Sequence, residues 1–586
     1  MVLEFGSFQL DVATCELREE GKPVRLQPQP VKVLALLASN AGSLVTRERI
    51  RSEIWSGDTF VDFEQGLNYC IAQIRTALGD RARSPQYIET LQRRGYRFVA
   101  PVRNTTAVPE TAVKILLAVL PFENLSGDAD QEFFSDGLTE EMITELGRVN
   151  PQRLGVIART SAMRYKGRAH SIDQVARELG VSYILEGSVR RASDRVRVTA
   201  QLIQASDQSN IWSEAFDRSL GDMLALQSEL ATSIAQAIRV RLAPAEEKRL
   251  ASRRPIAPAA YDLYLKGRYL WNQRTRESLD EGARCFERAI EHHMDYAAAY
   301  AGLADIYLTQ LDYNYLPPRE AFSLANRAVL EALRLDDTLA DPHTSLGHLR
   351  LHEFNWRAAE QEFLRAIDLN PSYATAHYYY GNLLAALGRT DEAAAEGRRV
   401  LELDPMSANA RQNLAFLLYL AQRYDEALKQ CAEANAIDRQ PNTDYLTGLI
   451  HERLGRYDDA VRAFAQRWPK TARSRTTVAA AIGFVQAQAG QRDEALQARN
   501  RLESLSEHEY VSSYDLALLY LALGDADLAV ERLWRAHEEF SSMLPYVNVD
   551  ARIDSLRSHP SFRALIERMR FPPRPERAPT TSTIRT

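Results

Sequence analysis

The sequence predicts a multidomain fold with an N-terminal α+β domain, a central α/β domain and a C-terminal all-α solenoid. Three observations carry this prediction. An amphipathic helix at 63–78 is followed at once by an arginine-rich hairpin, and strand and helix patterns alternate over 113–243. From residue 347 onward, small residues recur at steps of 34, 34, 33, 35 and 34. A length of 586 residues suits about three to four domains.

The amino-acid composition is that of a globular protein and not of a membrane or disulfide-rich protein. Hydrophobic residues make up 45% and charged residues 26% of the chain, as in a soluble globular protein. The cysteines at 15, 70, 285 and 431 show no metal-like spacing, which indicates a reducing compartment and no zinc site. The N-terminus lacks a leader pattern, and apolar runs such as Ile115–Val119 are far shorter than the roughly 20 residues of a membrane helix. We therefore expect a cytoplasmic protein with no membrane partner, metal or cofactor.

The helix expected near Phe63–Leu78 separates apolar from polar residues. Leu67, Ile71, Ile74 and Leu78 recur at i, i+4, i+7 and i+11, which is one helix face. The opposite face is polar and nearly uncharged, and its amide and hydroxyl groups are able to read base edges. It comprises Gln65, Asn68, Tyr69, Ala72, Gln73 and Thr76, with Arg75 at its flank.

An arginine-rich hairpin follows this helix, with strands expected at 87–91 and 96–99 and a turn at 92–95. Between residues 65 and 103 the chain holds seven arginines against two acids, although its net charge is −6. Such local positive charge favours contact with phosphates. The alternative is an ordinary amphipathic helix with a solvated face, joined to a surface hairpin.

Residues 1–102 resemble the OmpR/PhoB-type winged-helix domain, in the variant found in CadC- and ToxR-like regulators. The resemblance rests on EIWSGDTFVDFEQGLNYCIAQIRTALGD and YIETLQRRGYRFVAPV. N-terminal strands at 5–10, 16–19 and 23–26, a helix near 29–39 and a second helix capped by Thr46 fit this plan. The resemblance implies that residues 63–78 form the recognition helix, that 92–96 form the wing, and that the domain binds double-stranded DNA.

The resemblance also implies roles for individual residues. Five residues match positions that face the major groove: Gln65, Asn68, Tyr69, Ala72 and Gln73. Arg75 and Thr90 match positions near the phosphate backbone, and Arg93 and Arg94 lie in the wing. Thr76 and Arg97 complete the predicted DNA-binding set. Relatives often carry Arg at the positions of Ala72 and Gln73, so base preference does not transfer. Cys70 is interpreted as a redox sensor or as a buried filler, and its helical angle favours the filler.

A polar linker at 103–112 precedes an alternation of strands and helices over 113–243 that predicts an α/β sandwich. Phrases such as LAVLPFENLSGD and YILEGSVRR resemble the TolB N-terminal-like (FlgO-like) domain. Residues 124–128 suggest a phosphate cradle or a tight turn, and the missing P-loop lysine favours the turn. Two interpretations apply to Asp136, Glu140 and Glu141. They suggest paired carboxylates for acid/base catalysis, or acids at a helix N-terminus that interact favourably with the helix dipole. The second interpretation is favoured.

After a linker at 244–257, residues 258–548 repeat a helical hairpin with small residues at the crossing points. Gly388, Gly455, Gly490 and Gly524 mark the turns, and larger residues such as Phe286 fill the grooves between helices. This pattern resembles about eight tetratricopeptide repeats, which form a groove for a peptide or helix. His292 and His293 suggest a pair of metal ligands. Adjacent residues point to different sides of a helix, however, which favours two ordinary polar side chains on the surface.

The pattern of apolar residues predicts a capping helix at 549–571, and the composition predicts a disordered tail at 572–586. Together these features favour a soluble, one-component, sequence-specific transcriptional regulator with neither a receiver domain nor a membrane anchor. It would bind DNA as a homodimer, while the repeats sense a signal or hold a protein or peptide partner. The alternative is a repeat scaffold with weak or vestigial DNA binding. The sequence shows no catalytic residues or enzyme motif, so we expect no enzyme.

Overall fold

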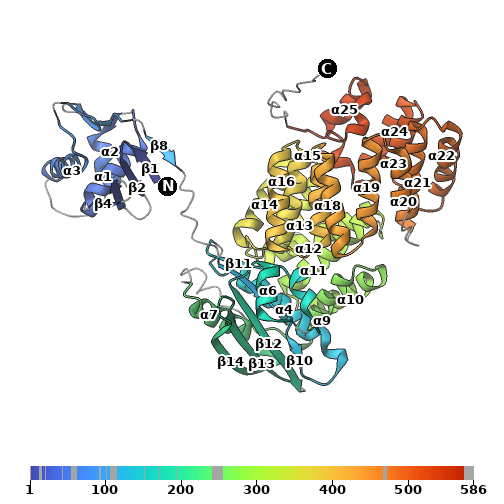
Figure 1. Cartoon of the computed structure of the whole chain (residues 1–586), viewed down its shortest axis with the longest axis horizontal. Coiled ribbons are helices and arrows are strands. Elements are labelled where there is room, and N and C mark those ends of the chain that lie inside the picture. The colour runs from blue at the N-terminus through green and yellow to red at the C-terminus, as the bar shows by residue number, and fades with distance from the viewer. Residues whose placement is uncertain are drawn as a thin grey trace. The chain divides into compact units, whose positions relative to one another are not determined.

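The computed structural model divides into two compact units, Met1–Val113 and Lys114–Thr586, which Figure 1 shows coloured along the chain. The structure describes residues 2–11, 16–19, 22–24, 26–42, 44–54, 63–82, 84–91, 94–100, 102–105, 115–150, 152–168, 170–192, 194–240, 255–313, 315–465 and 472–572. Within these residues, no helix has both the length and the apolar character that crossing a membrane requires.

In the residues that the structure describes, the first unit combines two antiparallel sheets with three helices. One sheet has the order β4-β3-β2-β1-β8, with β1 Val2–Phe5, β2 Phe8–Asp11, β3 Glu16–Glu19, β4 Lys22–Val24 and β8 Arg103–Thr105. The other has the order β5-β7-β6, with β5 Leu44–Thr46, β6 Ile88–Leu91 and β7 Gly95–Phe98. The helices are α1 Pro28–Ser39, α2 Arg47–Ile54 and α3 Phe63–Leu78.

Local sequence explains several of these boundaries. Pro28 opens α1, where the missing amide hydrogen costs nothing. The Thr46 hydroxyl accepts a hydrogen bond from the Arg49 backbone N–H at 3.2 Å, so Thr46 caps α2 as predicted. Strand β8 pairs with β1, so part of the segment that the sequence predicted as a linker extends the first sheet instead. Backbone pairing of this kind has no strong side-chain signature, which is why the composition pointed to a linker.

The central part of the second unit is a mixed sheet with the order β11-β9-β12-β13-β14, and β10 pairs with β12. Its strands are β9 Ile115–Val119, β10 Glu123–Asn124, β11 Leu154–Val156, β12 Tyr183–Ala192, β13 Arg195–Gln204 and β14 Ser209–Ser219. Its α-helices are α4 Glu132–Gly147, α5 Arg159–Ala162, α6 Ile172–Leu179 and α7 Met223–Ala237. Side chains alternate across the sheet: Leu117 and Val119 pack in the core with α4 and α7, whereas Ala118 and Leu120 pack with α6.

Eight helical hairpins follow in the described part of the chain, and Figure 1 shows them stacked from α9 to α24. The first helices of the hairpins are α9 Pro258–Gln273, α11 Ala297–Asp312, α13 Ala340–His352, α15 Ala374–Ala386, α17 Ala408–Leu420, α19 Pro441–Arg453, α21 Ala472–Gln488 and α23 Ser513–Ala522. The second helices are α10 Arg276–His292, α12 Pro318–Leu335, α14 Trp356–Leu369, α16 Thr390–Leu403, α18 Tyr424–Ile437, α20 Tyr457–Ala465, α22 Arg492–Ser506 and α24 Ala526–Glu538.

The small residues and turn glycines act as the sequence predicted. A Cβ atom on Gly448 would lie 2.4 Å from the ring of Phe464, so only glycine lets this aromatic side chain fill the crossing point. Gly388, Gly455, Gly490 and Gly524 all have left-handed φ values, between +70° and +89°. Glycine adopts this conformation without a steric penalty, which explains its place between the paired helices.

The central sheet and the first hairpins share one hydrophobic core, which runs from Leu117 in β9 to Leu349 in α13. Beyond that core, central residues contact the loops that join successive hairpins. Arg148 donates to the Thr338 carbonyl at 2.9 Å, the Val156 N–H donates to the Ser372 hydroxyl at 3.2 Å, and the Met406 N–H donates to the Ser161 hydroxyl at 2.9 Å. Residues 338, 372 and 406 are 34 positions apart, so the central region contacts equivalent sites of three repeats.

The C-terminal segment differs from the single capping helix predicted for 549–571. It forms a 3₁₀ helix, Ala551–Leu556, and a short α-helix, α25 Pro560–Arg568. Pro560 causes the break, because it holds His559 in an extended conformation at φ −70° and ψ 127°. The Trp356 indole N–H donates to the Met569 carbonyl at 2.8 Å, so this segment contacts the third hairpin. The predicted disordered tail lies, apart from Pro572, outside the described residues.

Candidate DNA-binding interface

Helix α3 buries the stripe that the sequence predicted. Leu67, Ile71, Ile74 and Leu78 are at most 4% exposed and belong to the core of the first unit. Cys70 joins them at 3% exposure, and burial raises the pKa of its thiol. A buried, protonated thiol is a poor nucleophile, so the structure supports the filler interpretation of Cys70 over the redox sensor.

The opposite face of α3 is exposed to solvent. Gln65, Asn68, Ala72 and Thr76 are exposed, and Gln73 is half-buried. Tyr69 is a large aromatic side chain with 51% of its surface exposed. The structure therefore brings six of the predicted residues onto one polar surface, where side-chain amides and hydroxyls are the available hydrogen-bonding groups.

A polar network that the sequence did not predict holds the start of α3. The Tyr96 hydroxyl donates to Asn68 Oδ1 at 3.1 Å, and Arg47 donates to the same hydroxyl at 3.3 Å. Arg47 also pairs with Glu64 in the first turn of α3. Burial raises the pKa of Tyr96, so its phenol remains a donor. The network joins α2, α3 and β7, and no local spacing in the sequence shows that these residues meet.

Arg75, at the flank of the polar face, has partners within the first unit. Its guanidinium donates to the Ile88 carbonyl at 2.8 Å and to the Thr90 hydroxyl at 2.9 Å. Only 15% of the Arg75 side chain is exposed. Arg75 and Thr90 therefore tie α3 to β6, and both side chains are already engaged within the protein.

Asp80 anchors the segment that leads from α3 to the hairpin. Its carboxylate accepts backbone hydrogen bonds from Gln86 at 2.7 Å and from Ile88 at 2.9 Å. The side chain is fully buried, and it lies 3.9 Å from Arg75 Nε. This acid therefore stabilises the loop instead of facing solvent beside the arginines.

The hairpin β6–β7 presents cations on its exposed side. Arg94 is exposed at the turn, where its backbone N–H donates to the Leu91 carbonyl at 2.9 Å. The Arg97 side chain is 40% exposed and pairs with Glu89 at 3.5 Å. The predicted wing residue Arg93 lies outside the described residues. Among the predicted set, the structure thus places Arg94 as an exposed cation next to the turn.

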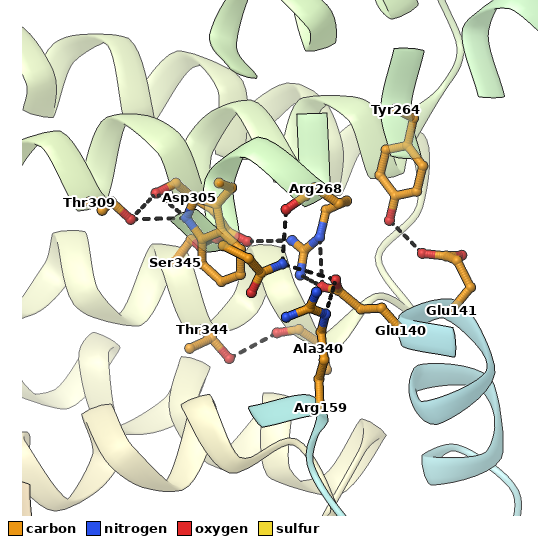
Figure 2. Close-up of polar contacts among 12 residues, drawn as sticks. Glu140, Glu141, Arg159, Tyr264, Arg268, Asp305, Thr309, Ala340, Thr344 and Ser345 are labelled. Atoms are coloured by element: carbon orange, nitrogen blue, oxygen red, sulfur yellow. Dashed lines mark hydrogen bonds and ion pairs between the residues drawn. The ribbon is translucent and has the colours of Figure 1, made fainter. Parts of the chain in front are cut away.

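In the second unit, Figure 2 shows a buried ionic cluster where the central region meets the repeats. Arg268 on α9 pairs with Glu140 on α4 and, at 3.0 Å, with Asp305 on α11. Burial alone would raise the pKa of Glu140, but Arg268 and Arg159 outweigh it and hold the pKa below its usual value. Tyr264 donates to Glu141 at 2.7 Å beside this cluster. All of these groups have partners from other elements, which indicates a structural joint.

This geometry corrects one prediction and supports another. Glu140 and Glu141 lie in the middle of α4, not at its N-terminus, and Arg268 and Tyr264 of the repeats are among their partners. The sequence could not show this, because these two partners lie more than 100 residues away. At residues 124–128 the Ser126 N–H donates to Asn124 Oδ1 at 3.0 Å, and Gly127 has a φ of 74°. That arrangement is the tight turn that the sequence favoured over a phosphate cradle.

Three segments match described protein families. Residues 21–98 match "Transcriptional regulatory protein, C terminal", and residues 113–235 match "HilA/YgeH-like transcriptional regulator, second domain". Residues 345–408 match "Tetratricopeptide repeat". The N-terminal and repeat matches confirm the resemblances predicted for those segments. The predicted TolB-like relationship of the central region stays a prediction, since the family found there is the HilA-like one.

Curated relatives match parts of the chain. Putative adenylate cyclase 3 of Rhizobium meliloti is 42% identical over 226 residues, which are 38% of each chain. Transcriptional regulator HilA of Salmonella typhimurium is 24% identical over 336 residues, 57% of this chain and 58% of the relative. Transcriptional regulatory protein KdpE of Mycobacterium tuberculosis is 34% identical over 99 residues, 17% of this chain and 43% of the relative. The chain thus spans less than two thirds of each relative.

Proposed function

We propose that this chain, which contains an OmpR/PhoB-type DNA-binding domain, a HilA-like regulator domain and tetratricopeptide repeats, is a sequence-specific transcriptional regulator. The observation that carries the proposal is the exposed polar face of α3, which hydrogen bonds join to the β6–β7 hairpin that carries the exposed Arg94. A helix of this kind fits the major groove, and exposed arginines contact phosphates. HilA and KdpE are named as regulators, which supports the same function.

Individual residues take distinct roles in this proposal. Gln65, Asn68 and Gln73 read base edges, while Tyr69 and Ala72 supply the apolar contacts of the same surface. Arg93, Arg94 and Arg97 contact phosphates, with Thr76 as a polar neighbour at the end of the helix. Arg75 and Thr90 position α3 against β6, because their side chains are engaged with each other.

The second unit supplies the interaction surface. The repeats and the C-terminal segment line an open hollow of about 1280 Å³, whose lining residues include Trp356, Arg357, Trp534 and Arg568. Aromatic and arginine side chains are enriched where proteins hold protein partners, so we assign a protein or peptide partner to the repeats. We further propose that the protein acts on DNA as a homodimer and is not an enzyme. The adenylate cyclase named among the relatives shares only part of its length with this chain.

Salt-dependent DNA binding tests this proposal. We expect the full chain, and residues 1–113 as a compact unit, to bind duplex DNA with an affinity that falls steeply as salt rises. The fragment should extend to residue 113 so that β8 keeps its pairing with β1. The measurement is fluorescence anisotropy on DNA selected from a random pool. If neither the chain nor the fragment shows salt-dependent binding, the scaffold alternative replaces the regulator.

Matched variants separate base readout from phosphate contact. Asn68→Ala or Gln73→Ala should relax sequence preference, whereas Arg93→Ala with Arg94→Ala should weaken binding to all sequences alike. The double arginine variant should also make the slope of log affinity against log salt concentration less steep, by roughly one for each phosphate that it no longer neutralises. Arg18→Ala on β3 of the other sheet is the control for loss of a positive charge, and it should leave both the sequence preference and the affinity unchanged. An unchanged preference in both amide variants would move base readout away from α3.

A further inference from the structure

A cluster of two histidines and one aspartate lies within the repeats. His348 and His352 are one turn apart on α13, and Asp312 is the last residue of α11. Their nearest ligand-type atoms all lie within 4.8 Å of one another. Both histidines are 3% exposed, while the Asp312 side chain is 34% exposed, so the cluster is buried with one accessible edge.

The distances within the cluster suit a metal ion. The two Nε2 atoms are 3.2 Å apart, and His348 Nε2 is 3.6 Å from Asp312 Oδ1. In a tetrahedral zinc site with Zn–N bonds of about 2.0–2.1 Å, two nitrogen ligands are separated by about 3.3 Å. Two imidazole nitrogens that face each other at this distance form a weak hydrogen bond, but they are well placed to share a cation.

Neighbouring groups orient the cluster. The Tyr379 hydroxyl donates to Asp312 Oδ2 at 3.2 Å, which leaves Oδ1 directed at His348. The Tyr379 ring stacks on His348 with ring centroids 4.3 Å apart. Metal sites commonly hold their ligands through outer hydrogen bonds of this kind, and removal of such a partner weakens metal affinity about 10- to 100-fold.

We propose that Asp312, His348 and His352 form a binding site for a divalent transition-metal ion, with zinc as the preferred metal. Two imidazoles and one carboxylate are a common ligand set for zinc, and three protein ligands leave a fourth position for water or another donor. His352 also lines the open hollow between the repeats and the C-terminal segment. The site departs from the expectation of no metal drawn from the sequence.

Zinc binding to the full chain, prepared without a histidine tag, tests the proposal. Titration calorimetry with Zn²⁺ alone should show one tight site per chain. His348→Gln and His352→Gln should each lower the affinity about 100-fold or more, because each removes a ligand outright, and Tyr379→Phe should lower it about 10- to 100-fold. His343→Gln on the same helix is the matched control, because His343 pairs with Glu362 instead, and it should bind like the unaltered chain.

A second readout requires no variant. Co²⁺ in place of Zn²⁺ should give the intense visible absorption of a four-coordinate site, which remains decisive if a histidine variant fails to fold. The absence of a tight Zn²⁺ site in the unaltered chain would overturn the proposal. So would Zn²⁺ binding that His348→Gln and His352→Gln leave unchanged. DNA binding does not enter these measurements, so their outcome is independent of the proposed regulator function.

Discussion

At the scale of single residues, the chemical type of a side chain predicted whether it is exposed, but it did not predict which residue the side chain contacts. The sequence placed Gln65, Asn68 and Thr76 on an exposed helix face, and the structure exposes all three. It placed Arg75 at the flank of that face, where the guanidinium donates to the Ile88 carbonyl and the Thr90 hydroxyl. A long cationic side chain reaches several neighbours from one helical position, so its partner depends on which strand lies beside it.

A pair of arginine variants distinguishes these two situations. Arg75→Ala should lower the free energy of unfolding of the first unit by about 1–3 kcal/mol, because it removes two hydrogen bonds to β6. Arg94→Ala, at an exposed position, should change it by less than about 0.5 kcal/mol. Denaturant unfolding of residues 1–113 measures both effects. Equal effects of the two variants would show that the Arg75 hydrogen bonds do not stabilise the unit.

At the scale of elements, the periodicity of apolar and small residues located α3 and the repeat helices. Close packing between elements decided where glycine is required. Gly95 opens β7 with a φ of 151°, and a Cβ atom there would lie 2.1 Å from the Val45 carbonyl oxygen. The hairpin therefore requires glycine at this position because β5 passes close to it. Pairing between β5 and β7 joins residues about 50 positions apart, which no local pattern encodes.

Gly95→Ala should destabilise the first unit by about 3 kcal/mol or more, because the added methyl group collides with backbone atoms that cannot move aside. Gly79→Ala is the control: its φ is 65°, but nothing lies within 4 Å of the added Cβ atom. That variant should cost only about 1–2 kcal/mol of backbone strain. Thermal unfolding of residues 1–113 compares them, and a smaller loss of stability for Gly95→Ala would contradict the packing argument.

At the scale of the whole molecule, the central region and the repeats behave as one body. The Ser161 N–H and hydroxyl both donate to the buried carboxylate of Asp404, at 2.9 Å and 2.6 Å. Arg191 pairs with Asp262 across the same boundary. The two regions are therefore joined by direct polar contacts as well as by their shared hydrophobic core.

Asp404 gives this joint a pH dependence. Burial raises the pKa of its carboxyl to about 6, against the opposing hydrogen bonds from Ser161. The folded state therefore holds a proton that the unfolded state releases near pH 4, so this group lowers stability as pH rises from about 4 to about 6. Asp404→Asn carries no such charge, so its stability relative to the unaltered chain should improve by about 1.4 kcal/mol between pH 5 and pH 7.5, the part of the shift that lies above pH 5.

Thermal or denaturant unfolding of the full chain at both pH values measures this difference. Taking the variant relative to the unaltered chain removes the contribution of other titrating groups. Among these, Glu452, whose pKa is raised to about 7 by burial, acts in the same direction as Asp404. A relative stability that stays constant or worsens with rising pH would contradict the assignment.

The sequence by itself determined the elements whose signal is local. The apolar stripe of α3, the Thr46 cap and the repeating glycines each follow from spacings that a single helix or turn imposes. The tertiary structure alone decided which distant groups meet: Arg75 with β6, Tyr96 with Asn68, Glu140 with Arg268, and Asp312 with His348. Those contacts join residues separated by 13 to 128 positions, because folding, not sequence proximity, brings them within bonding distance.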